Sequence, residues 1–179
     1  MQLSSDPFMK QVNYASQIVP LLEKDDNDTY DCLIAQLSHS DGIRGFFVSY
    51  LTNDNDTDEE VPKLLIDAMK SIKDQKDLVK LAIMNVIMPT AMSTMHTDLE
   101  LQTNSSNTAK KGLQVLKELT DHPDVSKHCN AIHHVATSRW DVDGEFNDDL
   151  HKYWFEFMKN YGYEEKQRDD IASVVKQFL

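Results

Sequence analysis

Glycine, cysteine and long apolar runs are scarce in this chain of 179 residues. Two cysteines cannot form a framework of disulfide bridges, so we expect Cys32 and Cys129 to be small buried thiols in a reducing compartment. The longest apolar run, residues 81–92, is interrupted by polar residues and by Pro89, and it is too short to span a bilayer. Residues 1–10 contain no basic segment followed by an apolar one, so the sequence predicts a cytoplasmic protein without a secretion signal.

Positive charge is also scarce, because 18 lysines and arginines stand against 30 aspartates and glutamates, for a net charge of −12. The basic residues form no cluster, and proteins bind phosphate backbones through such clusters. We therefore expect no binding to nucleic acid and none to anionic membrane surfaces. A protein partner that is attracted by charge is expected to be basic.

Signature motifs of catalysis and of metal binding are missing. The chain contains no Gly-x-Ser-x-Gly, no Gly-x-x-x-x-Gly-Lys and no Gly-x-Gly-x-x-Gly. Cys-x-x-Cys and His-x-x-x-His pairs are missing as well, and the acidic segment from Asp141 fails the calcium-loop pattern because its twelfth position is Lys152. The sequence therefore predicts a protein that is not an enzyme, with no cofactor and no metal site.

Apolar residues recur at spacings of three and four along nearly every ordered stretch, which is the period of an amphipathic helix. No alternating stretch is long enough to predict a strand. The fold class is therefore all-α, in a single domain of residues 1–179, with a loop at 96–107 whose second half is small and polar. The helices are expected at 7–23, divided near Pro20, and at 29–37, 41–52, 59–72, 75–95, 108–119, 123–137, 145–161 and 164–178.

A polar phrase occurs three times, each time between two amphipathic stretches. It reads Ser38-x-x-Asp41-x-x-Arg44, then Asp74-x-x-Asp77-x-x-Lys80, then Asp121-x-x-Asp124-x-x-Lys127. The first residue can cap a helix, the acid is favourable at the positive end of the helix dipole, and the base can pair with the acid three positions before it. Three helix starts of one design are therefore expected, which indicates stacked helical hairpins.

The phrase and its period resemble the HEAT and armadillo-like helical repeats over residues 29–137, most clearly at 65–82 and 112–125. The resemblance implies an array of three antiparallel hairpins, with residues 1–28 as an N-terminal capping helix and residues 138–179 as a C-terminal capping hairpin. The first copy departs from the pattern, because Ser38 replaces the first aspartate and two glycines lie inside its second helix. A generic multi-helix bundle is the alternative fold, since its helices also need caps.

Helical repeats usually hold another molecule, so the leading hypothesis is a non-enzymatic protein-interaction or scaffold module that presents a helical face to a partner. On the resemblance, the second helix of each hairpin lies on that face. The residues expected there are Arg44, Tyr50, Lys80, Lys127 and His134. The sequence leaves the identity of the partner and the oligomeric state open.

The helix expected at 75–95 supports a hypothesis of another class. It is apolar on nearly all sides, which is typical of an enclosed helix, and it carries a stripe of methionines. The stripe consists of Met84, Met88, Met92 and Met95. Methionine can line an adaptable pocket or surface, although core filling around Pro89 would explain the same stripe. The alternative is thus a small helical protein that binds an apolar ligand or a metal beside the stripe, with His96 or His134 as a polar anchor.

Overall fold

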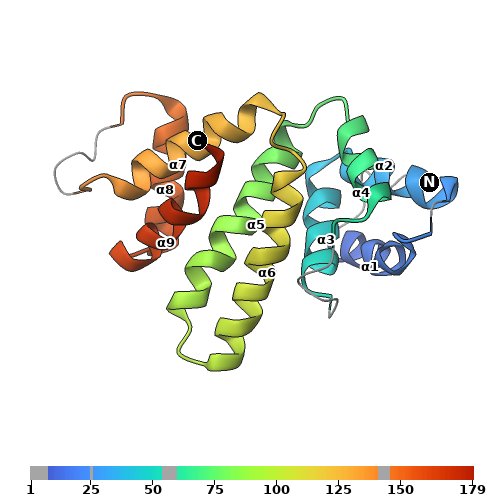
Figure 1. Cartoon of the computed structure of the whole chain (residues 1–179), viewed down its shortest axis with the longest axis horizontal. Helices are drawn as coiled ribbons and strands as arrows, with labels where there is room; N and C mark the ends of the chain where they lie inside the picture. The colour runs from blue at the N-terminus through green and yellow to red at the C-terminus, as the bar shows by residue number, and fades with distance from the viewer. Residues whose placement is uncertain (1–7, 25, 54–59, 141–145) are drawn as a thin grey trace. The chain divides into compact units, whose positions relative to one another are not determined.

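The computed structural model describes residues 8–24, 26–53, 60–140 and 146–179. Over these residues it contains nine α-helices, two short 3-10 helices and no strand (Figure 1). The all-α prediction is confirmed for this part of the chain. The chain divides into two compact units, the first of residues 1–82 and 110–119 and the second of residues 83–109 and 120–179.

The first unit contains four complete helices and parts of two more. The complete ones are α1 (Phe8–Ile18), α2 (Asn27–Leu37), α3 (Ser40–Leu51) and α4 (Lys63–Ser71), with the 3-10 helix η1 (Val19–Leu21) after α1. Pro20 lies within η1, so the predicted division of the first helix near this proline is confirmed. The start of α5 (Lys76–Met95) and the end of α6 (Leu99–Lys117) complete this unit.

Helices α1 and α3 approach each other closely at Gly45. A Cβ atom on Gly45 would lie 2.6 Å from the Cβ of Gln11 and 2.8 Å from the backbone nitrogen of Val12. The Ser49 hydroxyl donates to the Val12 carbonyl at 3.0 Å, and the buried Gln36 amide donates to the Gln11 carbonyl at 2.8 Å. One of the two glycines that depart from the repeat pattern is therefore required by packing.

The second unit contains three complete helices: α7 (Pro123–Thr137), α8 (Asp149–Asn160) and α9 (Glu165–Val175), with the 3-10 helix η2 (Lys176–Phe178) at the end. An aromatic core of Trp154, Phe157 and Tyr163 lies within it. The Trp154 ring is fully buried, meets the Phe157 ring edge-on at 5.4 Å, and donates its Nε1 proton to Nδ1 of His128 on α7 at 3.1 Å. Burial raises the pKa of the Tyr163 hydroxyl above its usual value.

The three polar phrases lie where expected, at the starts of α3, α5 and α7, but two of the predicted caps are wrong. His39, in place of Ser38, caps α3 by accepting the backbone N–H three residues on at 3.1 Å. His122, in place of Asp121, caps α7 by accepting the backbone N–H two residues on at 3.2 Å. Asp74 accepts from the first backbone N–H of α5 at 3.3 Å, so the cap by this aspartate is confirmed.

Candidate functional site

Helix α5 has two contrasting faces along its part in the second unit. One face carries aliphatic side chains that are fully buried: Ile83, Val86, Ile87 and Ala91. The other face carries the predicted methionine stripe, in which Met84, Met88 and Met92 are half-buried and Met95 is 40% exposed. The partly exposed side of α5 therefore mixes methionines with the polar residues Asn85, Thr90 and Ser93, whereas an ordinary surface helix is mostly polar on this side.

The length and composition of α5 alone would suffice to cross a membrane, with a mean hydropathy of 1.4 over a window of which 39% is buried. Among the described residues, α5 is the one helix that is long and apolar enough to cross a membrane. The buried core helix of a globular protein can have the same length and composition. Pro89 lies inside it and removes one backbone donor. Nearby hydroxyls bond helix carbonyls, Thr90 to Val86 at 2.7 Å and Ser93 to Thr90 at 2.7 Å.

Helix α6 begins at Leu99, so the loop predicted at 96–107 is wrong for most of its length. Asp98 starts the helix, because its carboxylate accepts from the backbone N–H of Leu101 at 3.0 Å. Within the small polar segment, the Thr103 hydroxyl donates to the carbonyl of Leu99 at 2.8 Å. The Thr108 hydroxyl donates to the carbonyl of Asn104 at 2.9 Å. The side chains that suggested a loop thus lie on the helix and bond its own carbonyls.

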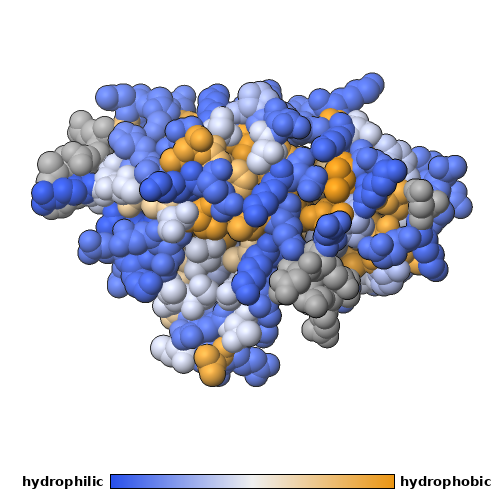
Figure 2. Space-filling model, in the orientation of Figure 1, coloured by the Kyte–Doolittle hydropathy of each residue, from blue (hydrophilic) through white to orange (hydrophobic). Residues whose placement is uncertain are grey.

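The end of this helical hairpin has no core of its own. We call residues 92–109 the hairpin tip, and none of their side chains is buried. Three large apolar side chains in it are open to solvent, Met95 at 40%, Leu99 at 76% and Leu101 at 48%. Apolar surface is visible at the end of the α5–α6 hairpin in Figure 2, surrounded by polar surface. Its charged side chains are Asp98 and Glu100, which are also the only Asp, Glu, Lys or Arg residues between positions 81 and 109.

Sequence reasoning found the methionines of this surface but missed Leu99 and Leu101. Both lie in the segment that was predicted to be a loop, so no helical face was considered there. One signal could have found them, since a stretch of the chain from 81 to 109 with two charged residues is unusual in a sequence that is 27% charged. Low charge over such a length is expected of a core or of an interface.

The cavities that we describe lie in the first unit and not beside the methionine stripe. The first has a volume of about 380 Å³, and the second, of about 480 Å³, lies between the start of α2 and helix α4. Met84, Met88, Met92, Met95 and His96 do not line either cavity. A ligand pocket beside the stripe therefore stays a prediction. His96 is half-buried, and its backbone carbonyl accepts a hydrogen bond from the Gln102 amide at 2.7 Å.

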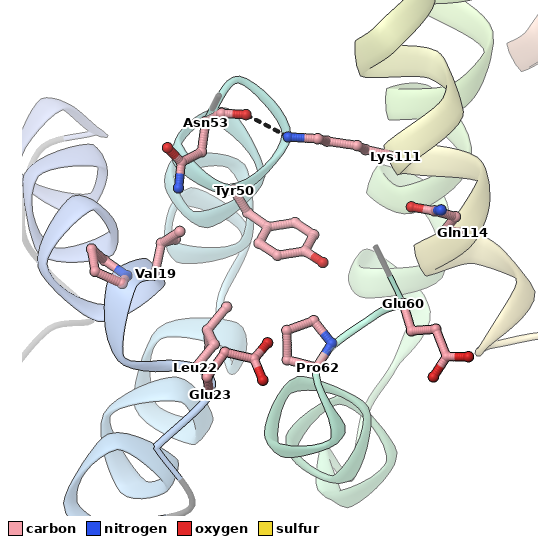
Figure 3. A pocket seen from close by; sticks show the side chains of 10 residues that line it. Val19, Leu22, Glu23, Tyr50, Asn53, Glu60, Pro62, Lys111 and Gln114 are labelled. Carbon is pink, nitrogen blue, oxygen red and sulfur yellow. Dashed lines mark hydrogen bonds between the residues drawn. The ribbon is translucent and has the colours of Figure 1, made fainter. Parts of the chain in front are cut away.

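The first cavity contains one of the residues predicted to bind a partner, Tyr50. Figure 3 shows its ring pointing into the cavity between the end of α3 and the residues of α6. Lys111 of α6 is buried there, and its ammonium group donates to the carbonyl of Asn53. Glu23 and Glu60 also line the cavity. The lining thus combines one buried cation, an aromatic ring and two carboxylates that are exposed to solvent.

The five residues predicted to bind a partner lie on three helices. Arg44 and Tyr50 are on α3, Lys80 is on α5, and Lys127 and His134 are on α7. Arg44 pairs with Asp41 at 3.3 Å, as the phrase predicted, and Lys127 is exposed. The first three residues belong to one unit and the last two to the other, so a common surface that unites all five stays a prediction.

Two histidine rings of the second unit contact each other and an aromatic ring. The rings of His134 and His151 lie 5.0 Å apart, and Phe146 stacks on His151 at 5.9 Å. Nδ1 of His151 lies 2.5 Å from a carboxylate oxygen of Asp148. Among the described residues, no group of three or more His, Cys, Asp or Glu side chains is placed to hold a metal ion.

The titratable groups with shifted pKa values have structural explanations. The backbone N–H of His151 holds the pKa of Asp148 below its usual value, and the backbone N–H of Thr29 does the same for Asp26, because both carboxylates cap helices. Burial raises the pKa of Cys129 to about 12. These groups lie at helix starts or inside a core, so their shifted pKa values do not indicate a catalytic centre.

Comparison with protein-family models gives a match over nearly all of the chain. The family model described as Uncharacterised conserved protein UCP020893 matches residues 8–178, which is nearly the whole chain. No curated protein and no solved structure matches the chain.

Proposed function

The chain belongs to the family described as Uncharacterised conserved protein UCP020893, and we propose that it is a non-enzymatic protein-interaction module whose binding surface is the hairpin tip. One observation carries the proposal: no side chain of residues 92–109 is buried, although Met95, Leu99 and Leu101 are large and apolar. Helices in proteins draw most of their stability from a packed apolar face. A partner that covers this surface would complete the missing packing.

The composition of the hairpin tip fits an interface better than an ordinary surface. Interface cores are poor in charge and rich in methionine, and the hairpin tip has the charged pair Asp98 and Glu100 among apolar and small polar residues. Full burial of a leucine stabilises by about 1.5–3 kcal/mol. Leu99 and Leu101 together could therefore supply a substantial part of the free energy of a moderate complex, before the cost of association is subtracted.

We retain two finer proposals about this module. The repeat proposal is supported by the starts of α3, α5 and α7, each of which coincides with one copy of the polar phrase. The proposal that the module binds neither nucleic acid nor anionic membrane surfaces is supported by the net charge of −12, which repels phosphate groups. No cofactor is required by either proposal.

The proposal can be tested by native mass spectrometry of the full chain purified gently from its own cells. The substitutions Leu99→Ser and Leu101→Ser are combined in one variant, and Met9→Ser on α1 serves as the control because Met9 is 70% exposed and distant in sequence. We expect a stoichiometric complex, heavier than 20.6 kDa by the mass of one protein, for the wild type and the control. The tip variant should be found alone. A complex that survives in the tip variant, or a bare chain in all three samples, would overturn the proposal.

A further inference from the structure

The hairpin tip also indicates which kind of partner it fits. Resting on the proposed function, we infer that the partner binds through an amphipathic α-helix that carries basic residues beside its apolar face. Three features of the described hairpin tip support this inference: its helical backbone, the chemistry of its apolar side chains and the sign of its charge.

The helical backbone of the hairpin tip favours a partner that binds as a helix over one that binds as an extended strand. A strand binds by pairing with free backbone groups at the edge of a sheet, and the tip is formed by the ends of two helices whose backbone groups bond within each helix. The Thr103 and Thr108 hydroxyls even bond carbonyls of α6 a second time. A helix needs no backbone partner, because its side chains pack into the grooves between side chains of the neighbouring helices. One added helix would turn the hairpin tip into a three-helix bundle.

The apolar side chains of the hairpin tip fit a helix with spaced anchors. Met92 and Met95 are three residues apart and therefore lie on one side of α5, while Leu99 and Leu101 are two residues apart and point to different sides of the first turn of α6. Methionine is unbranched and adapts to irregular neighbours, which is why grooves that receive amphipathic helices use it. The expected ligand thus presents apolar residues at i, i+3, i+4 and i+7.

The charge of the hairpin tip selects a basic helix over an acidic one and over a second copy of this chain. Asp98 and Glu100 are the acids next to the exposed leucines, and the whole chain carries a net charge of −12. Two copies that meet at their hairpin tips would bring these four carboxylates together, and an anionic membrane would repel them. Lysines or arginines beside the apolar face of a partner helix would be attracted instead.

The inference can be tested with three synthetic peptides of about 18 residues, which is five helical turns. The basic peptide has leucines on one helical face and lysines on the other. The acidic peptide has glutamates in place of the lysines, and the scrambled peptide has the basic composition without an apolar face. Binding is measured by titration calorimetry with the full chain at low and high salt, using the wild type, the Leu99→Ser, Leu101→Ser variant and the Met9→Ser control.

We expect the basic peptide to bind at least about tenfold more tightly than the acidic and scrambled peptides at low salt, with weaker binding as salt rises. The tip variant should lose at least about tenfold in affinity, because it removes the leucine that the peptide contacts, whichever of the two it is, and the control should bind like the wild type. Equal binding of the tip variant and the wild type would show attraction to the acidic surface in general and would overturn the inference.

Other results would overturn the inference while leaving the proposed function in place. If the native complex is lost in the tip variant but none of the peptides binds, or the acidic one binds best, the surface takes a partner of other chemistry. Sedimentation velocity that shows a dimer lost in the tip variant would assign the surface to a second copy of the chain. Flotation with uncharged phosphatidylcholine vesicles, lost in the same variant, would assign it to a lipid surface and would overturn the proposed function as well.

Discussion

The aromatic core and the hairpin tip belong to the same unit but are held together in different ways. Trp154 is fully buried between rings and is hydrogen-bonded through its indole nitrogen, so α7 and α8 are fixed by side chains of the unit itself. The hairpin tip has no buried side chain, and its polar contacts at Asp98, Thr103 and Thr108 lie within α6. One described hydrogen bond joins the tip to another helix of the unit, from the Gln167 amide of α9 to the Thr94 hydroxyl at 3.4 Å. Apolar residues in the first region stabilise the fold, whereas those in the second are available to another molecule.

The largest difference between the two regions should appear in stability. We expect Trp154→Ala to lower the free energy of unfolding by about 3–5 kcal/mol, because it removes a large buried ring and leaves the His128 ring without its donor. Leu99→Ala should change the same quantity by less than about 0.5 kcal/mol, because that side chain is 76% exposed. Urea unfolding followed by circular dichroism measures both. An equal loss of unfolding free energy in the two variants would contradict the distinction between a packed aromatic core and an unpacked hairpin tip.

The reactivity of the buried Cys129 thiol gives a second test of whether the core around α7 stays closed to solvent. Burial raises the pKa of Cys129 on α7 from 9.0 to about 12, so at pH 8 its thiolate fraction should be about a thousandfold lower than that of an ordinary thiol. Alkylation monitored by mass spectrometry should therefore modify the half-buried Cys32 first and leave Cys129 unmodified until the chain unfolds. Modification of Cys129 at the same rate as Cys32 in the folded chain would show that this core opens readily.

The same pKa shift predicts how stability changes with pH. The folded state favours the neutral thiol of Cys129, so this contribution is fully present below pH 9.0 and is lost as the pH rises towards about 12. Burial of Tyr163 raises the pKa of its hydroxyl and acts in the same direction. Urea unfolding at rising pH should show less loss of stability in a Cys129→Ala variant than in the wild type. An identical slope in both proteins would contradict this account of Cys129.

A substitution of Asp98 at the start of α6 should destabilise the hairpin tip without affecting the aromatic core. Asp98→Ala removes the side chain that accepts the backbone N–H of Leu101, and loss of such a cap costs about 1 kcal/mol locally. Hydrogen–deuterium exchange should become about fivefold faster at amides of the hairpin tip and stay unchanged in α8. Asp98→Asn, which retains a capping oxygen, serves as the control. Faster exchange in α8 as well would mean that the two regions unfold together.

The smallest change in stability is expected at Leu99 and Leu101, the two residues that we propose to bind the partner. In the absence of a partner, Leu99→Ser and Leu101→Ser should each change the free energy of unfolding by less than about 0.5 kcal/mol, since both side chains are open to solvent. Thermal unfolding of the purified chain provides the measurement. A loss of more than about 2 kcal/mol would show that these leucines are part of the folded core and would argue against a binding role.

Helical periodicity predicted most of the fold, because it depends on side chains that face the core. The starts of α3, α5 and α7 and the stripe from Met84 to Met95 could be predicted in this way. The segment 99–107 could not, because serine, threonine and asparagine have weak helix propensity and commonly indicate loops. Its helix depends on the Asp98 cap, on threonine hydroxyls that bond helix carbonyls and on its place beside α5 in one hairpin.

The candidate site was predictable only in part for the same reason. The sequence shows that residues 81–109 are poor in charge, but it does not distinguish a buried segment from an open one. Exposure of Leu99 depends on which neighbours are missing, and this is a property of the assembled unit. The caps by His39 and His122 depend in the same way on the backbone geometry at the start of each helix, which the spacing of polar residues does not specify.

The most direct test of the proposed binding surface is hydrogen–deuterium exchange of the full chain with and without the basic amphipathic peptide. The account predicts that peptide binding slows exchange at the amides of residues 92–109 and leaves α8 unchanged. Slower exchange around Arg44, Lys80 or Lys127, with unchanged exchange at 92–109, would contradict it and would assign binding to the face predicted from the repeat resemblance.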